Sequence, residues 1–144
     1  MNRPYTVGGV GHPLPAVPLT IAFITAINQG DLAALVSLMT ADHRLQIFDE
    51  SPVVGRDANK RAWTGYLASF PSYVIYPRQI ADCGDGIAAV LGHTTGSHLG
   101  RSDAEEAQET LIWLAETTDG EVAVWTLLED SPLNRERYGL GRQQ

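Results

Sequence analysis

An Asp-Gly pair between two apolar runs constrains the fold of this chain most strongly. Residues 110–130 read TLIWLAETTDGEVAVWTLLED, with β-branched and aromatic residues on both sides of Asp119 and Gly120. Such a pair favours a two-residue type I′ turn, because both central residues of that turn need φ > 0. The sequence therefore predicts a β-hairpin that closes at Asp119 and Gly120.

The turn also sets the register of the two strands. Pairing Thr118 with Glu121 across the turn places Leu114 opposite Trp125. Successive side chains of a strand point to opposite faces, so every second residue shares a face. One face is therefore expected to carry Ile112, Leu114, Trp125, Leu127 and Glu129, and the other face Leu111, Trp113 and Leu128.

Both faces of this hairpin are apolar, whereas a hairpin with one wet face alternates polar and apolar residues. Helices from the N-terminal part of the chain are expected to cover one face. Leaving Leu111, Trp113 and Leu128 in water on the other would forgo on the order of 8–10 kcal/mol of burial, at ~25 cal/mol per Å². We therefore expect a homodimer that forms through the outer face of the sheet.

Upstream of the hairpin, apolar residues recur at helical spacing in three segments. Gly30 is expected to end the first helix, Asp31 to cap the second and Asp57 to cap the third. Pro77 falls inside a predicted strand, which indicates an edge strand or a bulge. The expected helices span residues 20–28, 32–40 and 58–70, and the expected strands before the hairpin span residues 45–48, 73–81 and 87–95.

A chain of 144 residues is large enough for one domain with a single core. Helices followed by a succession of antiparallel strands predict an α+β fold, with three N-terminal helices packed on a strongly curved antiparallel β-sheet. Such a cone leaves a cavity for a small molecule. We expect residues 1–17 to form an irregular arm, residues 18–131 the domain, and residues 132–144 a tail that frays or docks through Tyr138 and Leu140.

Charge and composition exclude several classes of partner. The net charge of −7 argues against nucleic acid and anionic membrane, because both need a basic surface on the protein. No apolar run is long enough to span a bilayer, and residues 1–18 lack the apolar core of a secretory signal. Cys83 is the single cysteine, which fits a reducing compartment, so we expect a cytoplasmic protein.

A resemblance to a known superfamily is carried by the segment AFITAINQGDLAALVSLMTADHRLQIFDESPVVGRDANKRAW. It resembles the opening of the nuclear-transport-factor-2-like superfamily, whose members share N-x-G-D-L…L…D…G-x-x-A. The segments GHTTGSHLG and DGEVAVWTLLED resemble the closing strands of its SnoaL-like polyketide-cyclase branch. The resemblance covers residues 18–131 and implies a cystatin-like cone. Its members include isomerases, dehydratases, cyclases and binding modules, so it is specific for fold rather than activity.

The catalytic residues of the ketosteroid-isomerase branch are not matched. The resemblance places Phe23 where those enzymes have an oxyanion-hole tyrosine, and Ile112 where they have the second donor. Ile47 stands at the position of the base, with Asp49 two residues later on the same face. Oxyanion chemistry needs donors where charge develops, so steroid isomerisation is disfavoured. The Arg-x-Asp of limonene-type epoxide hydrolases is also missing from residues 111–113.

The polyketide-cyclase branch is matched in part. Its G-T-H-x-G pattern would supply a histidine where this chain has Thr94, which leaves His93 and His98 as nearby candidates. Its W-x-x-x-D pattern supplies an acidic base, and Trp125 and Glu129 match that spacing. A carboxylate among apolar residues suits a general acid or base. The alternative is that Glu129 is solvated at the end of its strand.

We therefore expect a small-molecule-binding protein, acting as a cofactor-independent cyclase, isomerase or dehydratase by carboxylate–histidine proton transfer. The alternative is a non-catalytic ligand-binding or dimerisation module of the same fold, because the oxyanion donors are missing. We expect no cofactor and no metal, since the histidines lack a ligand spacing such as H-E-x-x-H. The candidate catalytic residues are Glu129, Asp49, His98 and His93, and the candidate contacts to a small apolar substrate are Phe23, Trp63, Tyr66, Thr94, Ile112, Leu114, Trp125 and Leu127.

Overall fold

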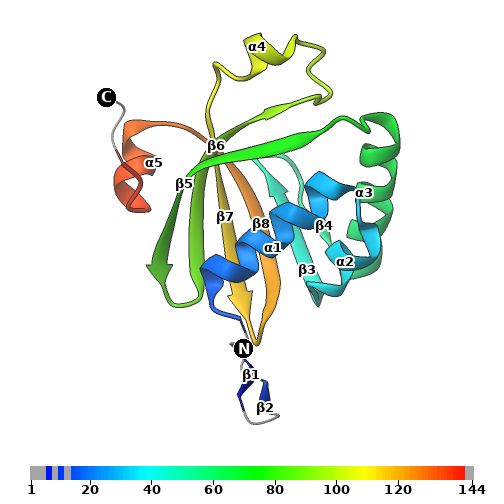
Figure 1. Ribbon diagram of the computed structural model, residues 1–144, viewed down its shortest axis with the longest axis vertical. Helices are drawn as coiled ribbons and strands as arrows, with labels where there is room; N and C mark the ends of the chain where they lie inside the picture. Colours follow the sequence, from blue (N-terminus) through cyan, green and yellow to red (C-terminus); the bar gives the residue numbers. More distant parts are fainter. Residues whose placement is uncertain (1–5, 8–9, 12–13, 142–144) are drawn as a thin grey trace.

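A curved six-stranded sheet forms the body of the molecule, and its strand order is β4-β3-β8-β7-β6-β5. The computed structural model describes residues 6–7, 10–11 and 14–141 of the chain. Helix α1 crosses the concave face of the sheet, and α2 and α3 follow it along one side (Figure 1). The predicted α+β fold is therefore confirmed. The helices are α1 (Ala16–Gln29), α2 (Leu32–Ser37), α3 (Arg56–Ser69), α4 (Asp103–Glu106) and α5 (Pro132–Arg137).

The strands of the sheet are β3 (Met39–Ile47), β4 (Val53–Val54), β5 (Val74–Gly84), β6 (Ile87–Thr95), β7 (Leu111–Thr118) and β8 (Glu121–Glu129). Strands β5 to β8 pair in antiparallel succession, whereas β3 pairs parallel with β8. Two further strands, β1 (Thr6–Val7) and β2 (Val10–Gly11), pair as a short ribbon within the expected irregular arm. The rest of that arm up to residue 13 lies outside the described residues.

The first two helices meet at the predicted Gly30 and Asp31. Gly30 has φ of 66°, and its N–H bonds the carbonyls of Ala26 and Ile27. The Asp31 side chain accepts from the N–H of Ala34 at 3.1 Å. Helix α1 begins at Ala16, earlier than residue 20, because Pro18 lies in its first turn, where a helical N–H has no intrahelical partner.

Strand β3 is longer than the expected residues 45–48, and the second helix is correspondingly shorter than residues 32–40. The N–H of Val122 bonds the carbonyl of Leu38 at 2.7 Å, so the chain already runs beside β8 where a helix was expected. His43 is fully buried in β3, with its Nδ1 2.6 Å from the carbonyl oxygen of Val122. Residues 41–44 therefore form part of a strand despite their polar sequence, because pairing with β8 stabilises it.

Pro77 marks an edge strand with a bulge, as predicted. Strand β5 is the last strand of the sheet, and its register with β6 shifts between Pro77 and Gln79. The missing N–H of proline therefore does not interrupt a central ladder.

The predicted hairpin turn is confirmed, but the predicted register beyond it is wrong. Asp119 and Gly120 have φ of 50° and 80°, and Thr118 pairs with Glu121. A bulge then leaves Ala123 as an extra residue of β8, because Thr117 pairs with Val122 and Glu116 pairs with Val124. Leu114 consequently lies opposite Thr126 rather than Trp125.

This shift in register reverses the faces to which the side chains of β7 point. Trp113 pairs with Leu127 on the concave side and is 1% exposed, so it was wrongly expected on the outer face. Ile112 and Leu114 lie on the convex side instead, in a cluster with Leu91 and Leu140. Neither can contact a ligand on the concave side.

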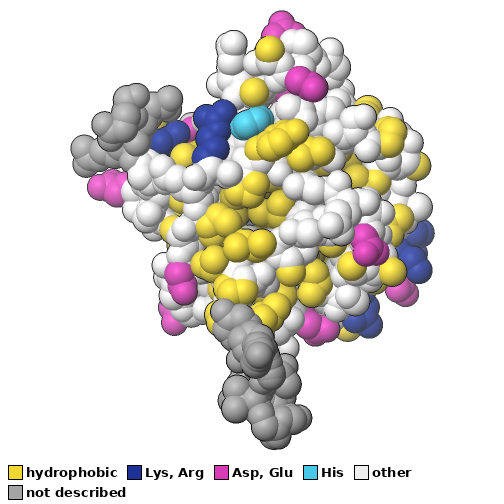
Figure 2. All heavy atoms as spheres, viewed as in Figure 1, with side chains coloured by type: hydrophobic (Ala, Val, Ile, Leu, Met, Phe, Trp, Pro, Cys, Tyr) yellow, Lys and Arg dark blue, Asp and Glu magenta, His cyan; other side chains and the backbone are white. Residues whose placement is uncertain are grey.

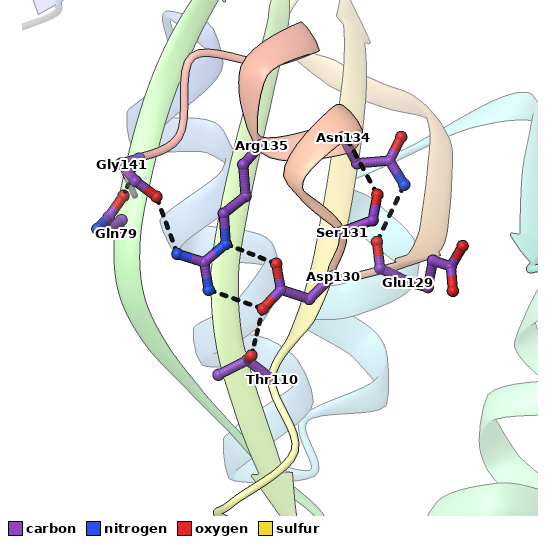
Figure 3. Close-up of polar contacts among 8 residues, drawn as sticks. All are labelled: Gln79, Thr110, Glu129, Asp130, Ser131, Asn134, Arg135 and Gly141. Atoms are coloured by element: carbon purple, nitrogen blue, oxygen red, sulfur yellow. Dashed lines mark hydrogen bonds and ion pairs between the residues drawn. The ribbon is translucent and has the colours of Figure 1, made fainter. Parts of the chain in front are cut away.

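The C-terminal segment docks on this convex cluster through Tyr138 and Leu140, one of the two expected alternatives. Asp130 holds α5 beside the hairpin, because Arg135 donates to its carboxylate at 2.6 and 2.7 Å and the Thr110 hydroxyl also donates to it (Figure 3). The chain's own tail thus covers apolar surface that a second copy was expected to cover. The homodimer stays a prediction, and a second copy would find less apolar surface to bury on the convex face.

Hydrophobic side chains also gather on the surface in the region between α1 and β5 (Figure 2). Large apolar residues that stay exposed in the described part of the chain include Ile21 of α1 and Tyr76 of β5. In that same part of the chain, no helix has the length and hydropathy needed to cross a membrane.

Candidate functional site

A chamber of about 470 Å³ lies between the concave face of the sheet, α3 and the segment that follows β6. Three tryptophans contribute to its wall: Trp63 from α3, Trp113 from β7 and Trp125 from β8. Apolar lining with a few polar groups is typical of small-molecule sites. The other apolar residues that line it are Leu45, Ile47, Phe48, Ala62, Leu99, Leu111 and Leu127.

Tyr66 and His98 bring the main polar groups together at this wall. The Tyr66 hydroxyl lies 2.9 Å from Nδ1 of His98, and the backbone N–H of His98 donates to the same oxygen at 3.2 Å. Burial raises the pKa of Tyr66, and its contact with His98 opposes that shift, so the phenol keeps its proton at neutral pH. Burial also raises the pKa of Tyr73, whose ring lies 5.1 Å from that of Tyr66.

Gly96 directs the chain from β6 toward Tyr66. Its φ is 71°, and a Cβ built there would lie 2.3 Å from the Ser72 carbonyl oxygen, so only glycine fits. The turn places Ser97 and His98 directly after β6 and beside α3. The position of His98 therefore depends on a turn that only glycine can form at residue 96.

A buried carboxylate lies behind the chamber wall. Glu106 of α4 is 2% exposed and accepts from the hydroxyl of Thr94, which lines the chamber. The N–H of Ser97 also donates to Glu106, at 3.4 Å. The sequence DAEEAQ looked like a solvated loop, so Glu106 was missed. The one available signal was Ser102-x-x-Glu105, which forms a capping box that starts α4.

The rim of the chamber is more polar and more exposed. Arg101 forms an ion pair with Glu109 there, with 42% and 57% of the two side chains exposed. Phe48 lies on the rim with a positive φ of 49°. The side chains of Phe48 and Leu99 are 42% and 48% exposed there. Glu50 also reaches the rim.

The two carboxylates expected in the chamber lie outside it. Glu129 shares a strand face with Trp125 and Leu127, but it is the last residue of β8 and is exposed, so it does not line the chamber. Asp49 lies in the exposed turn after β3 and does not line it either. The expectation that these two side chains project into the cavity is wrong, because β3 ends two residues before Asp49 and Glu129 lies at the exposed end of β8.

The two candidate histidines lie on opposite sides of the sheet. His98 lines the chamber, whereas His93 stacks on Tyr76 with ring centroids 4.8 Å apart. Arg78 donates to Nδ1 of His93 at 3.1 and 3.3 Å. Burial and the nearby Arg78 charge lower the pKa of His93. His93 therefore faces away from the cavity, as strand alternation with Thr94 requires.

The expected substrate contacts divide in the same way. Phe23 does not line the chamber; it is fully buried and packs behind Trp125, with ring centroids 4.8 Å apart. Ile112 and Leu114 face the convex side. The expected contacts that do line the chamber are Trp63, Tyr66, Thr94, Trp125 and Leu127.

Two other features do not compete with the chamber as a site. A larger hollow of about 740 Å³ lies beside α5, but two of the three charged side chains that line it, Asp130 and Arg135, bond each other. Among the described residues, no three His, Cys, Asp or Glu side chains stand close enough together to hold a metal ion. We therefore place the candidate site in the chamber.

The cone, its helices and its internal chamber define a cystatin-like α+β protein. A family model of the SnoaL-like domain matches residues 20–125, so the chain belongs to the SnoaL-like domain family. The resemblance to this branch of the nuclear-transport-factor-2-like proteins is thereby confirmed. A comparison with curated proteins finds no match.

Solved structures share this fold at low sequence identity. A cystatin-fold protein from Novosphingobium aromaticivorans is 16% identical with a TM-score of 0.69, over 81% of this chain and 99% of that one. An NTF2-like protein from Burkholderia pseudomallei is 15% identical with a TM-score of 0.65, over 85% and 96%. An epoxide hydrolase/cyclase-like enzyme of salinomycin pyran ring formation is 15% identical with a TM-score of 0.64, over 78% and 88%.

Proposed function

We propose that the chamber binds a small apolar molecule with a ring system and a carbonyl group, and that His98 and Tyr66 move a proton on it without a cofactor. The observation that carries this proposal is the hydrogen bond between the Tyr66 hydroxyl and Nδ1 of His98 at the wall of a mainly apolar cavity. The three tryptophan rings supply apolar contact area for the ligand. The ring nitrogens of the histidine supply the acid–base group.

The contact between Tyr66 and His98 is compatible with two proton arrangements. In one, the phenol donates to Nδ1 and the imidazole carries its proton on Nε2, where it can donate to a carbonyl oxygen. In the other, Nδ1–H donates to the phenol oxygen, and the Nε2 lone pair can accept a proton from the carbon next to a carbonyl. The proton then returns to the resulting enolate at a carbon or at the oxygen, which balances an isomerisation.

Deuterium exchange on a simple apolar ketone tests this directly. We expect the protein to accelerate exchange of the α-protons of 2-tetralone in D₂O, followed by proton NMR. His98→Gln should slow the catalysed exchange by about 100-fold or more, because general acid–base groups contribute that much. His93→Gln is the matched control, since His93 lies on the other side of the sheet, and it should exchange like the original protein.

A non-catalytic ligand-binding module is the second candidate. It is favoured by the positions of Glu129 and Asp49, which leave the inner chamber without either expected carboxylate. In that case 2-tetralone would raise the melting temperature, yet exchange would stay at the rate in buffer. Equal exchange in the original protein and in His98→Gln would likewise exclude the proton-transfer mechanism.

A further inference from the structure

Glu106 is a buried charged group that the proton-transfer chemistry does not use. It lies behind the chamber wall on α4, and its carboxylate accepts from Thr94 on one oxygen and from the N–H of Ser97 on the other. Thr94 is 4% exposed and lines the chamber. A carboxylate removed from water needs such donors, and the bond from the Thr94 hydroxyl is the shorter of the two.

The bond to Glu106 decides what Thr94 can offer to a ligand. A threonine hydroxyl has one proton and two acceptor lone pairs. Because the proton of Thr94 is directed at the carboxylate, only lone pairs remain for the chamber. A hydroxyl that is free to rotate would instead serve as donor or acceptor for any ligand.

We infer that Glu106 is a positioning residue that fixes Thr94 as a hydrogen-bond acceptor, so that the chamber selects ligands presenting a hydroxyl or an N–H at this point. The inference rests on the proposed function in one respect, namely that the ligand lies in the chamber. It identifies a determinant of specificity that is separate from His98 and Tyr66.

The substitution Glu106→Gln reverses the polarity of Thr94. A glutamine amide has one acceptor oxygen in place of two. The backbone N–H of Ser97 can only donate, so it retains that oxygen and leaves the amide NH₂ toward Thr94. The Thr94 hydroxyl must then accept from the amide, and its own proton becomes available to the chamber.

Two aromatic probes that differ in one proton measure this effect. The affinities of 2-naphthol, which can donate, and of 2-methoxynaphthalene, which can only accept, are determined by isothermal titration calorimetry. The ratio of the two Kd values is compared between variants, which removes the difference in hydration of the two probes. We expect Thr94→Val and Glu106→Gln each to lower the preference for 2-naphthol about tenfold, the usual effect of one buried hydrogen bond.

Two controls separate positioning from general disturbance of the fold. Thr94→Ser keeps the hydroxyl and should keep the preference for 2-naphthol. Asp103→Asn makes the same charge change on an exposed residue of α4 and should leave the ratio unchanged. Melting temperatures show whether each variant is folded, and a ratio of affinities does not change merely because the protein is less stable.

The outcomes distinguish the inference from the proposed function. If both probes bind and Glu106→Gln leaves their Kd ratio unchanged, the role of Glu106 is refuted while the binding chamber stands. If neither probe binds the original protein, the proposed function fails and the inference fails with it. A preference for 2-naphthol that falls in Thr94→Val and in Glu106→Gln, but stays unchanged in Thr94→Ser, supports both the inference and the proposed function.

Discussion

The two faces of the terminal hairpin are both apolar, and they are covered in different ways. On the concave face, Trp113 and Trp125 lie under helices that leave a chamber open beside them. On the convex face, Ile112 and Leu114 are covered by Tyr138 and Leu140 from the segment after α5, with Leu140 at 6% exposed. An apolar face can therefore form a binding cavity or a sealed core, and the covering segment decides which.

The concave face also receives polar groups that the convex cluster lacks among its described members. They come from segments remote from the hairpin: Tyr66 from α3, and Thr94 and His98 from the end of β6 and the residues after it. A cavity that is open to such segments can acquire chemistry. The convex cluster contributes stability instead.

Exchanging one residue on each face gives the largest expected effect. Ile112→Ala should lower the free energy of unfolding by about 2–5 kcal/mol, because Ile112 is fully buried and its removal leaves a cavity. It should leave the Kd of 2-naphthol unchanged. Leu127→Ala, which widens the half-buried wall of the chamber, should cost less stability and weaken that binding. Urea denaturation and calorimetry measure the two quantities.

Loss of binding in Ile112→Ala as well as in Leu127→Ala would restore the register expected from the Asp119-Gly120 turn, because that register puts both side chains on the chamber face. It would contradict the bulge at Ala123 and place Ile112 in the chamber.

Local signals in the sequence predicted much of the fold. The Asp119-Gly120 turn, the Gly30 cap and the Pro77 edge strand each depend on the backbone chemistry of a single residue, and each was correct. The bulge was not predictable, because Ala123 is small, fits either face and breaks no alternation of its own. One inserted residue then inverted the facing of every β7 side chain beyond it.

The candidate site was predicted less well because its residues meet through tertiary contacts. His98 and Tyr66 were named from the sequence, but their contact depends on the Gly96 turn and on how α3 lies over the sheet. Glu106 looked like one of several solvated acids, since burial of a single member of a charge run leaves no mark in composition. Glu129 matched the W-x-x-x-D spacing of the polyketide cyclases, but β8 ends at this residue and its side chain is exposed.

Buried polarity on the concave side predicts a pH-dependent stability of intermediate size. Burial lowers the pKa of His43 below its ordinary value of 6.5, against smaller opposing effects of Val122 and Asp42. As the pH falls, His43 is therefore protonated in the unfolded chain before it is protonated in the folded protein. The stability conferred by the neutral ring is fully present above pH 6.5 and declines as the pH falls below it toward the lowered pKa of the folded protein.

Chemical denaturation between pH 7.5 and 5.5 measures this decline. His93 adds to it with the same sign, because its pKa is also lowered, so His93→Gln provides the baseline. In that background, His43→Gln should flatten the remaining dependence, whatever its effect on absolute stability. An unchanged slope would show that His43 is protonated in the folded state and that its burial is incomplete.

The smallest expected effect tests how the tail is fastened to the convex face. Asp130→Asn should lower the free energy of unfolding by about 1 kcal/mol, the typical cost of a lost charge-assisted bond near a surface. Its neighbour Glu129, which is exposed at the strand end, provides a matched control, and Glu129→Gln should change the free energy of unfolding by less than about 0.5 kcal/mol.

Hydrogen bonds from Arg135 and Thr110 hold the pKa of Asp130 below its ordinary 3.8. The contribution of Asp130 is therefore present above pH 3.8 and is lost as the pH falls through the lowered value. Equal costs for the two substitutions at neutral pH would mean that Tyr138 and Leu140, rather than the ion pair, hold the tail in place.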